Sequence, residues 1–219
     1  MANGDFEFKL TGSTYKLQHY NGSAANVNIP SSYNGKKVTA IGPYVFYAHG
    51  EIRSVTIPNT VTCIENFAFK SSGIESIVLP DSVTQIGSGV FEECLSLKSV
   101  KLSNKIKRIE NSAFWQCIEL DGVILPKSLT EIGQKAFYEC KALTSIEIPA
   151  SVIVIEDDAF HYCGGLKRVV FANPDGWYLA ANPSDGYGQE LSAEELGYPP
   201  EAAKLLQKYF TYGNYWKRK

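Results

Sequence analysis

The feature that most constrains this chain is a repeat of about 23 residues that runs through most of its length. Phenylalanines recur at spacings of 23, 22, 23, 23 and 23 residues, and the short spacing marks a one-residue deletion near residues 71–73. The column consists of Phe46, Phe69, Phe91, Phe114, Phe137 and Phe160. A fixed period of this length predicts a solenoid, in which each repeat forms one coil and buries its apolar side against neighbouring coils.

A second column shares this register, because an aliphatic residue, usually followed by proline, ends an alternating apolar and polar stretch in each repeat. It consists of Ile57-Pro58, Leu79-Pro80, Leu102-Ser103, Leu125-Pro126, Ile148-Pro149 and Phe171-Ala172. The alternation predicts a half-buried strand, and a second short alternation, as at residues 129–132, predicts another strand in the same coil. Proline cannot donate to a strand ladder and so ends the first strand. The A-F-x-x-C stretch lacks alternation and predicts one helical turn on the return side.

The repeat unit is plainest from Leu143 to Cys163, which reads L-T-S-I-E-I-P-A-S-V-I-V-I-E-D-D-A-F-H-Y-C. It resembles the BspA-like type of leucine-rich repeat found in bacterial surface proteins and some protozoan ones. The resemblance covers about residues 27–172, and the chain departs from the commoner leucine-rich repeat by having cysteine in place of an asparagine ladder. The resemblance implies a right-handed, curved solenoid that serves adhesion or protein recognition at the cell surface or in secreted form.

The two ends depart from the repeat and are expected to cap it, since the terminal coils of a solenoid would otherwise expose apolar faces. Residues 1–26 alternate around a Gly12-Ser13 turn and predict a capping hairpin. Residues 27–172 form the solenoid of about six repeats, and an insertion at residues 33–37 is expected to protrude as an irregular loop.

Residues 173–219 are expected to form a C-terminal cap. Turn-rich segments at 173–176 and 182–186 precede a helix predicted near residues 200–210 from its proline start, early acid and late lysine. We expect Tyr212, Tyr215 and Trp216 to cover the last coil. The alternative is that they contact nucleic acid or membrane together with the three terminal basic residues 217–219.

Four of the five cysteines fall in one repeat column: Cys94, Cys117, Cys140 and Cys163. Stacked coils would place their Cα atoms near 5 Å apart, but their Cβ vectors would be parallel, which opposes a disulfide. Zinc needs ligands that converge on a point, whereas a ladder spreads them along a line. We therefore expect buried free thiols. Cys63 lies in a different column and is expected to be exposed, as the one candidate reactive thiol.

No catalytic or cofactor-binding pattern is present. The three histidines are scattered, and G-x-S-x-G, H-E-x-x-H, G-x-x-x-x-G-K and G-x-G-x-x-G do not occur. With 21 basic and 23 acidic residues, the chain has no broad attraction for nucleic acid or anionic lipid. No apolar run reaches the roughly 20 residues that cross a bilayer. We expect no enzyme activity, cofactor, metal or membrane insertion. A cytoplasmic location stays open because no signal peptide precedes the repeat.

One polar column alternates strictly between glycine and glutamate: Gly42, Glu65, Gly87, Glu110, Gly133 and Glu156. Identical carboxylates on adjacent coils would lie about 5 Å apart and repel each other. The alternation is explained by relief of that repulsion together with hydrogen bonds to amides of the next coil. The alternative is a row of cation sites, which lacks the dense Asp and Asn loops that calcium prefers.

The outward side chains of the first strand are the candidate binding surface, which the resemblance places on the concave side of the solenoid. The candidate residues are Ser76, Val78, Ser99, Lys101, Ile124, Ser145, Glu147 and Val170. We expect a monomer that binds a protein partner there, although tight packing would also explain the small serines. Two alternatives are a carbohydrate-binding protein and a structural spacer of a cell-surface assembly. The first would use the aromatic residues Tyr44, Tyr47, Trp115, Tyr138 and Tyr162.

Overall fold

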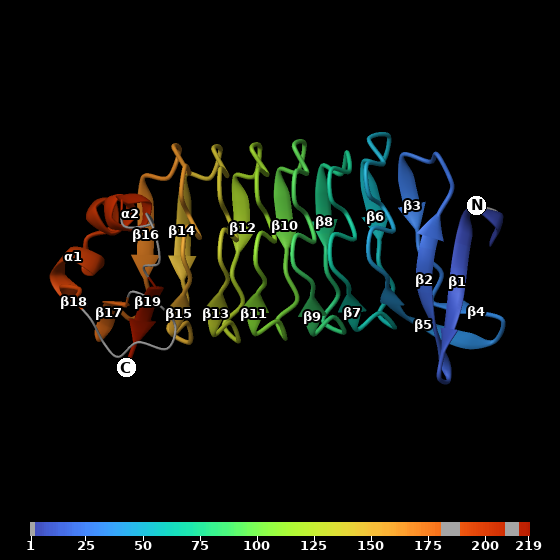
Figure 1. The fold of residues 1–219 in the computed structure, drawn as a ribbon, viewed down its shortest axis with the longest axis horizontal. Helices are drawn as coiled ribbons and strands as arrows, with labels where there is room; N and C mark the ends of the chain where they lie inside the picture. Colours follow the sequence, from blue (N-terminus) through green and yellow to red (C-terminus); the bar gives the residue numbers. More distant parts are fainter. Residues whose placement is uncertain (1–2, 181–188, 209–214) are drawn as a thin grey trace.

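A computed structural model of the chain describes residues 3–180, 189–208 and 215–219. The coils stack in single file, and each contributes a strand to two separate rows that run along the molecule (Figure 1). The predicted β-rich repeat solenoid is confirmed. A two-stranded hairpin lies at the N-terminal end, and two short helices lie at the C-terminal end.

The first row contains the strands that precede the proline column. They are β3 (Asn26–Asn28), β6 (Ser54–Thr56), β8 (Ser76–Val78), β10 (Ser99–Lys101), β12 (Gly122–Ile124), β14 (Ser145–Ile148) and β16 (Arg168–Phe171). They pair in parallel as β3 with β6, β10 with both β8 and β12, and β14 with β16. The register places equivalent repeat positions side by side, so that Ser99 pairs with both Ser76 and Gly122.

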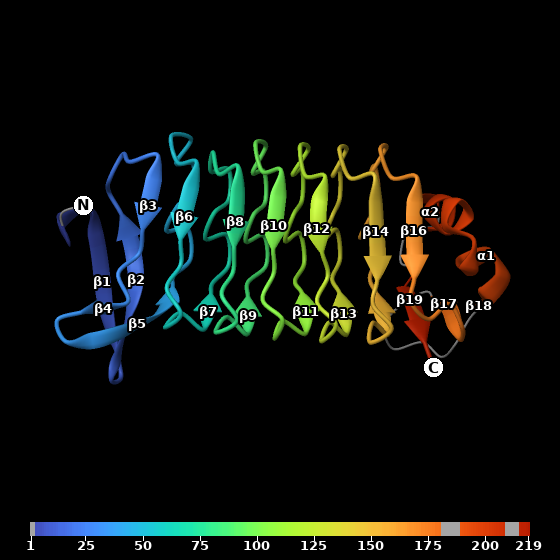
Figure 2. The same ribbon diagram turned by 180° about the vertical axis from the view of Figure 1, so that it is seen from behind.

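The second row contains the strands that follow the proline column, all of two residues except β5, and it is visible from behind in Figure 2. They are β5 (Lys36–Ile41), β7 (Cys63–Ile64), β9 (Gln85–Ile86), β11 (Arg108–Ile109), β13 (Glu131–Ile132) and β15 (Val154–Ile155). They also pair in parallel, but in two groups, β5-β7-β9 and β11-β13-β15. The row is therefore divided between β9 and β11.

The phenylalanine column forms a continuous spine through the core. All six side chains have no exposed surface. Neighbouring rings stack with centroids 5.0–5.4 Å apart and interplanar angles of 9–25°. Full burial of one such side chain contributes about 1.5–3 kcal/mol, and stacked rings add about 0.5–1.5 kcal/mol per pair. The spine therefore accounts for much of the attraction between coils.

The return side consists of turns rather than the helical turn that the A-F-x-x-C stretch predicts. The residues two before and two after each spine phenylalanine have left-handed φ angles of 55–59°. They are Tyr44, Ala48, Phe67, Ser71, Gly89, Glu93, Ser112, Gln116, Lys135, Glu139, Asp158 and Tyr162. A left-handed residue interrupts helical hydrogen bonding, and its N–H can donate to the next coil instead. Phe67 N donates to Ser88 O, and Ser71 N donates to Glu92 O, at 2.9 and 2.8 Å.

The N-terminal hairpin extends the second row. A short 3-10 helix, η1 (Asn3–Asp5), leads into β1 (Phe6–Thr11), which pairs antiparallel with β2 (Thr14–Tyr20), and β2 runs parallel to β5. The insertion at residues 33–37 forms an exposed turn, as expected, but this turn is regular rather than irregular. β4 (Ser32–Tyr33) and β5 form a tight hairpin around Asn34-Gly35, whose positive φ angles suit this turn. Tyr33 stacks on Phe8 at 4.5 Å, which ties the insertion to β1.

The C-terminal segment folds back over the last coils. It contains β17 (Trp177–Ala180), β18 (Gln189–Glu190), α1 (Ala193–Gly197), α2 (Pro199–Lys208) and β19 (Tyr215–Arg218). β19 pairs antiparallel with β15 and β17. Trp216 is fully buried and stacks on Phe171 at 5.9 Å, so an aromatic residue covers the end of the solenoid as expected. Residues 182–186, 209–210 and Tyr212, which also entered the sequence predictions, lie outside the described residues. The division at residues 26 and 172 stays a prediction.

Candidate functional site

The eight candidate residues lie on one surface, the outward side of β8, β10, β12, β14 and β16, which we call the outer strand face. Side chains alternate along each strand, so Ile77 and Val100 are buried while their neighbours point outward. The exposed candidates are Ser76, Val78, Ser99, Lys101, Ile124, Ser145 and Glu147, and Val170 is half-buried. The parallel register brings together residues that are 22 or 23 positions apart in the sequence.

Two large apolar side chains stand out on this face. Val78 is 59% exposed and Ile124 is 83% exposed, and the register places Lys101 between them. Such exposed apolar area gains about 25 cal/mol per Å² when a partner covers it. Tight packing does not explain the smallest residue nearby, because a Cβ added at Gly122 would lie 3.7 Å from Ser99 Cβ, an ordinary contact.

The aromatic residues that could stack on sugars lie on the return side. Tyr44, Tyr47 and Tyr162 are 49–58% exposed. Their rings meet neighbouring tyrosine rings edge to face, at 5.9 Å for Tyr44 with Tyr47 and 5.4 Å for Tyr138 with Tyr162. Trp115 meets Tyr138 in the same way at 6.2 Å. The contacts of Tyr138 with Trp115 and Tyr162 join neighbouring coils, which supports a packing role for these residues.

The column cysteines are buried free thiols, as predicted. Each Sγ donates to a phenylalanine carbonyl of the preceding coil at 3.0–3.2 Å, as Cys117 does to Phe91. Burial raises the pKa of Cys94 and Cys163 to about 12 and raises the pKa of Cys117 and Cys140 as well. The thiols are therefore protonated at neutral pH and act as hydrogen-bond donors inside the core.

The prediction that Cys63 is exposed is wrong. Cys63 is half-buried on β7, where Ala40 and Gln85 flank it on the paired strands. This burial raises the pKa of the Cys63 thiol, and the nearby Glu65 carboxylate adds to the effect. A raised pKa lowers the thiolate fraction at neutral pH, so Cys63 is a poor nucleophile.

The glutamates of the alternating column are neutralised by cations of the chain itself. Lys16 Nζ lies 2.9 Å from Glu65. Arg108 forms ion pairs with Glu110, Glu131 and Glu156. Partial burial opposes the charge of Arg108, but its hydrogen bond with Glu156 and the surrounding carboxylates raise its pKa overall. These contacts favour relief of repulsion over a row of cation sites.

The glycines of that column are required by side chains that sequence reasoning missed. A Cβ on Gly87 or Gly133 would lie 2.4 or 2.6 Å from the Oδ1 atom of Asn66 or Asn111. The same Oδ1 atoms accept hydrogen bonds from the N–H groups of residues 88 and 134 in the following coil. The available signal was that asparagine follows two of the three glutamates in the column.

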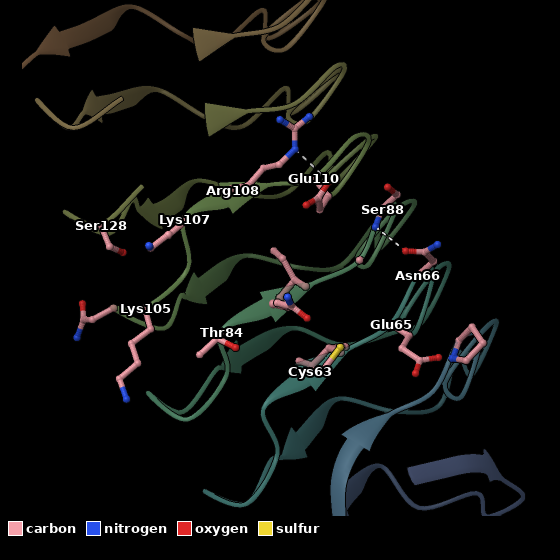
Figure 3. A pocket seen from close by; sticks show the side chains of 16 residues that line it. Cys63, Glu65, Asn66, Thr84, Ser88, Lys105, Lys107, Arg108, Glu110 and Ser128 are labelled. Atoms are coloured by element: carbon pink, nitrogen blue, oxygen red, sulfur yellow. Dashed lines mark hydrogen bonds and ion pairs between the residues drawn. The ribbon is translucent and has the colours of Figure 1, made fainter. Parts of the chain in front are cut away.

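A shallow groove of about 1070 Å³ lies over the second row, where β9 and β11 part (Figure 3). Thr84 and Gln85 lie along it, and Lys105 and Lys107 line one side. Sequence reasoning did not find this groove. Across the described parts of the chain, no group of three or more His, Cys, Asp or Glu side chains is arranged to hold a metal ion. Nor does any helix there have the length and apolar character to span a membrane.

Comparison with known proteins agrees with the repeat pattern. The family model described as "BspA type Leucine rich repeat region (6 copies)" matches residues 39–167. A leucine-rich repeat protein of T. pallidum is 27% identical with a TM-score of 0.55, over 77% of this chain and 70% of that one. One from Eubacterium ventriosum is 23% identical with the same TM-score, over 90% of this chain and 55% of that one.

A leucine-rich cell surface protein of Faecalibacterium prausnitzii is more distant, with 16% identity and a TM-score of 0.44 over 78% of this chain and 94% of that one. No curated protein matches the sequence. The comparisons indicate no enzyme family. The family model covers more than half of the chain, and the matched residues lie within the stacked coils. The chain therefore belongs to the BspA type of leucine-rich repeat proteins.

Proposed function

We propose that the chain is a non-enzymatic binding module that recognises a protein partner through the outer strand face. The observation that carries this proposal is the pair of exposed apolar side chains, Val78 and Ile124, on either side of Lys101. Protein interfaces commonly have an apolar centre and a polar rim. Here the apolar centre lies on paired parallel strands, which hold the side chains at fixed positions before binding.

The surrounding residues fit the same function. Ser76 and Ser99 lie beside the apolar pair and have short side chains, which lets a partner approach the strands closely. Glu147 adds a negative charge on β14, two coils from Lys101. A positive charge between the two apolar side chains and a negative charge beyond Ile124 would fix the orientation of a partner more than its affinity.

We infer a monomer located at the cell surface or secreted. The support is membership of this repeat family, whose resemblance to bacterial surface proteins implies such a location. The closed ends of the solenoid support the monomer, because Tyr20 packs on Phe46 at one end and Trp216 packs on Phe171 at the other.

A random peptide library displayed on phage tests the outer strand face. Peptides selected on the wild-type protein are measured against a variant with Val78→Thr and Ile124→Thr, which keeps β-branched residues on the strands. We expect at least tenfold weaker binding. Ile153→Thr, which removes another apolar residue that is 42% exposed, is the matched control and should bind normally. Equal binding of the selected peptides to all three proteins would refute the proposed face.

Carbohydrate binding is the second candidate, and the exposure of Tyr44 and Tyr162 on the return side favours it. A glycan array on the wild-type protein tests this function. Signals that disappear in Tyr162→Ser but persist in the Val78→Thr, Ile124→Thr variant would replace the protein-binding proposal.

A further inference from the structure

The second row opens at one place, between β9 and β11. In neighbouring coils, strand amides donate to the preceding coil, as Gly87 N does to Ile64 O and Gly133 N does to Ile109 O, both at 2.8 Å. Among the described residues, no backbone hydrogen bond joins residues 84–87 to residues 107–110. The carbonyls of Thr84 and Ile86 thus lack the backbone donor that their equivalents have. The groove lies over this opening.

The coil on one side of the opening also departs from the repeat in two polar columns. In the first column, the hydroxyls of Ser82, Ser128 and Ser151 donate to the preceding coil at 2.6–2.7 Å, and Lys105 occupies that position in the coil between. In the second column, the hydroxyls of Thr62, Thr84 and Thr130 donate in the same way at 2.9–3.4 Å, whereas Lys107 occupies that position beside the opening and Ile153 occupies it in a later coil.

These two replacements remove hydrogen bonds that stabilise the other coils and place two lysines at the groove. Positions where a repeat breaks its own local rule without structural compensation are typical of functional sites. Lys105 and Lys107 are therefore better explained by a ligand than by the fold.

The charge around the groove is unevenly balanced. Arg108 is paired with three glutamates, and Glu65 is paired with Lys16. Lys105 and Lys107 are exposed and form no ion pair within 4.0 Å among the described residues. Figure 3 shows them on one side of the groove, with Asn66, Ser88 and Glu65 on the other. The two lysines without an ion pair within 4.0 Å thus lie along one side only, with Asp81 as a more distant electrostatic partner of Lys105.

We propose that this groove binds an acidic peptide segment, whose carboxylates pair with Lys105 and Lys107 and whose backbone lies along the opening between β9 and β11. A peptide has N–H donors for the unpaired carbonyls of Thr84 and Ile86 and carries its charges at separate positions. A uniformly charged polymer such as nucleic acid or a sulfated glycan would meet the carboxylates of Glu65 and Glu110 at the groove. This site is independent of the outer strand face, and either can exist without the other.

The test is fluorescence anisotropy with a labelled ten-residue peptide in which Asp alternates with Thr. We expect it to bind the wild-type protein at least tenfold more tightly than the same peptide with Asn in place of Asp. The variant Lys105→Ser with Lys107→Thr should bind the acidic peptide at least tenfold more weakly. It introduces the residues that the other coils use, so its melting temperature should equal or exceed that of the wild type.

Matched controls test whether the loss of binding comes from the lost charge rather than from misfolding. They also test whether this site is distinct from the outer strand face. Lys36→Ser with Lys37→Thr makes the same charge change on β5 and should not alter binding. Lys105→Gln with Lys107→Gln keeps long side chains without charge, and this variant should also bind the acidic peptide at least tenfold more weakly. The Val78→Thr, Ile124→Thr variant should bind the acidic peptide normally. The proposal is overturned if the acidic peptide fails to bind, if the lysine variants bind it normally, or if heparin or an oligonucleotide binds more tightly.

Discussion

The phenylalanine spine makes a quantitative prediction about how coils stabilise each other. Phe137 stacks on Phe114 and Phe160, with both centroids 5.1 Å away and both interplanar angles 9°. Phe160 is equally buried but has a stacked ring on one side only among the described residues. Replacing either residue with leucine keeps an apolar side chain and removes the ring. The two variants therefore differ mainly by one stacked pair.

The expected difference in the free energy of unfolding follows from the one additional stacked pair that Phe137→Leu removes. A single aromatic pair contributes about 0.5–1.5 kcal/mol beyond the area that it buries. Phe137→Leu should therefore lower the free energy of unfolding by about 0.5–1.5 kcal/mol more than Phe160→Leu does. Urea unfolding followed by far-ultraviolet circular dichroism measures this difference, provided that both variants keep the wild-type m-value.

Tryptophan fluorescence provides a check on the same curves. Of the three tryptophans, Trp177 and Trp216 are buried at the C-terminal end and Trp115 lies in a central coil, whereas circular dichroism reports on all coils. If the two signals change at the same urea concentrations, unfolding is two-state, and one free energy of unfolding describes each variant. The stacking argument is refuted if Phe160→Leu lowers the free energy of unfolding as much as Phe137→Leu does, because burial alone would then account for both changes.

Three further predictions concern single residues. Gly133→Ala should destabilise the protein by about 1–3 kcal/mol, because its Cβ would meet Asn111. Gly122→Ala, whose Cβ would make only ordinary contacts, should be neutral or stabilising in the same denaturation assay. Burial and Asp157 raise the pKa of Asp158, so Asp158→Asn should stabilise the fold by a few tenths of a kcal/mol at neutral pH, discounted for solvent screening. This gain must disappear in acid, below the unfolded-state pKa, where Asp158 is protonated in both states, and a gain that persists in melting curves there would contradict the cause. In the native protein, Ellman's reagent should modify Cys63 more slowly than free cysteine and leave the column thiols unmodified, whereas rapid reaction of several thiols would contradict their burial.

The core was predictable from the sequence because its pattern repeats. Phe91 or Cys117 alone would carry little information, but each position recurs at one spacing in several coils. Stacking then forces equivalent residues into contact, which the ring distances and the thiol hydrogen bonds confirm. The outward candidates, such as Val78 and Ile124, followed from strand alternation in the same way.

The return turns and the groove depend on contacts between coils that no local pattern reveals. Ala and Glu near the spine favour a helix by propensity, yet inter-coil hydrogen bonds hold residues such as Glu93 in left-handed conformations. Gly89, in one coil of six, was the only sequence hint. The groove depends on the absence of pairing between two neighbouring strands. Lys105 and Lys107 break two columns visibly, but nothing local shows that β9 and β11 separate there.

The left-handed residues of the return turns have a consequence for cooperativity. A left-handed residue other than glycine costs about 1–2 kcal/mol, and nearly every coil contains two. A neighbouring coil offsets this cost by accepting the N–H of such a residue, as the carbonyl of Trp115 does for Glu93 at 2.7 Å. An isolated coil would carry the cost without the bond and should not hold its shape. Below a minimum number of coils the fold should therefore be lost as a whole rather than shortened one unit at a time.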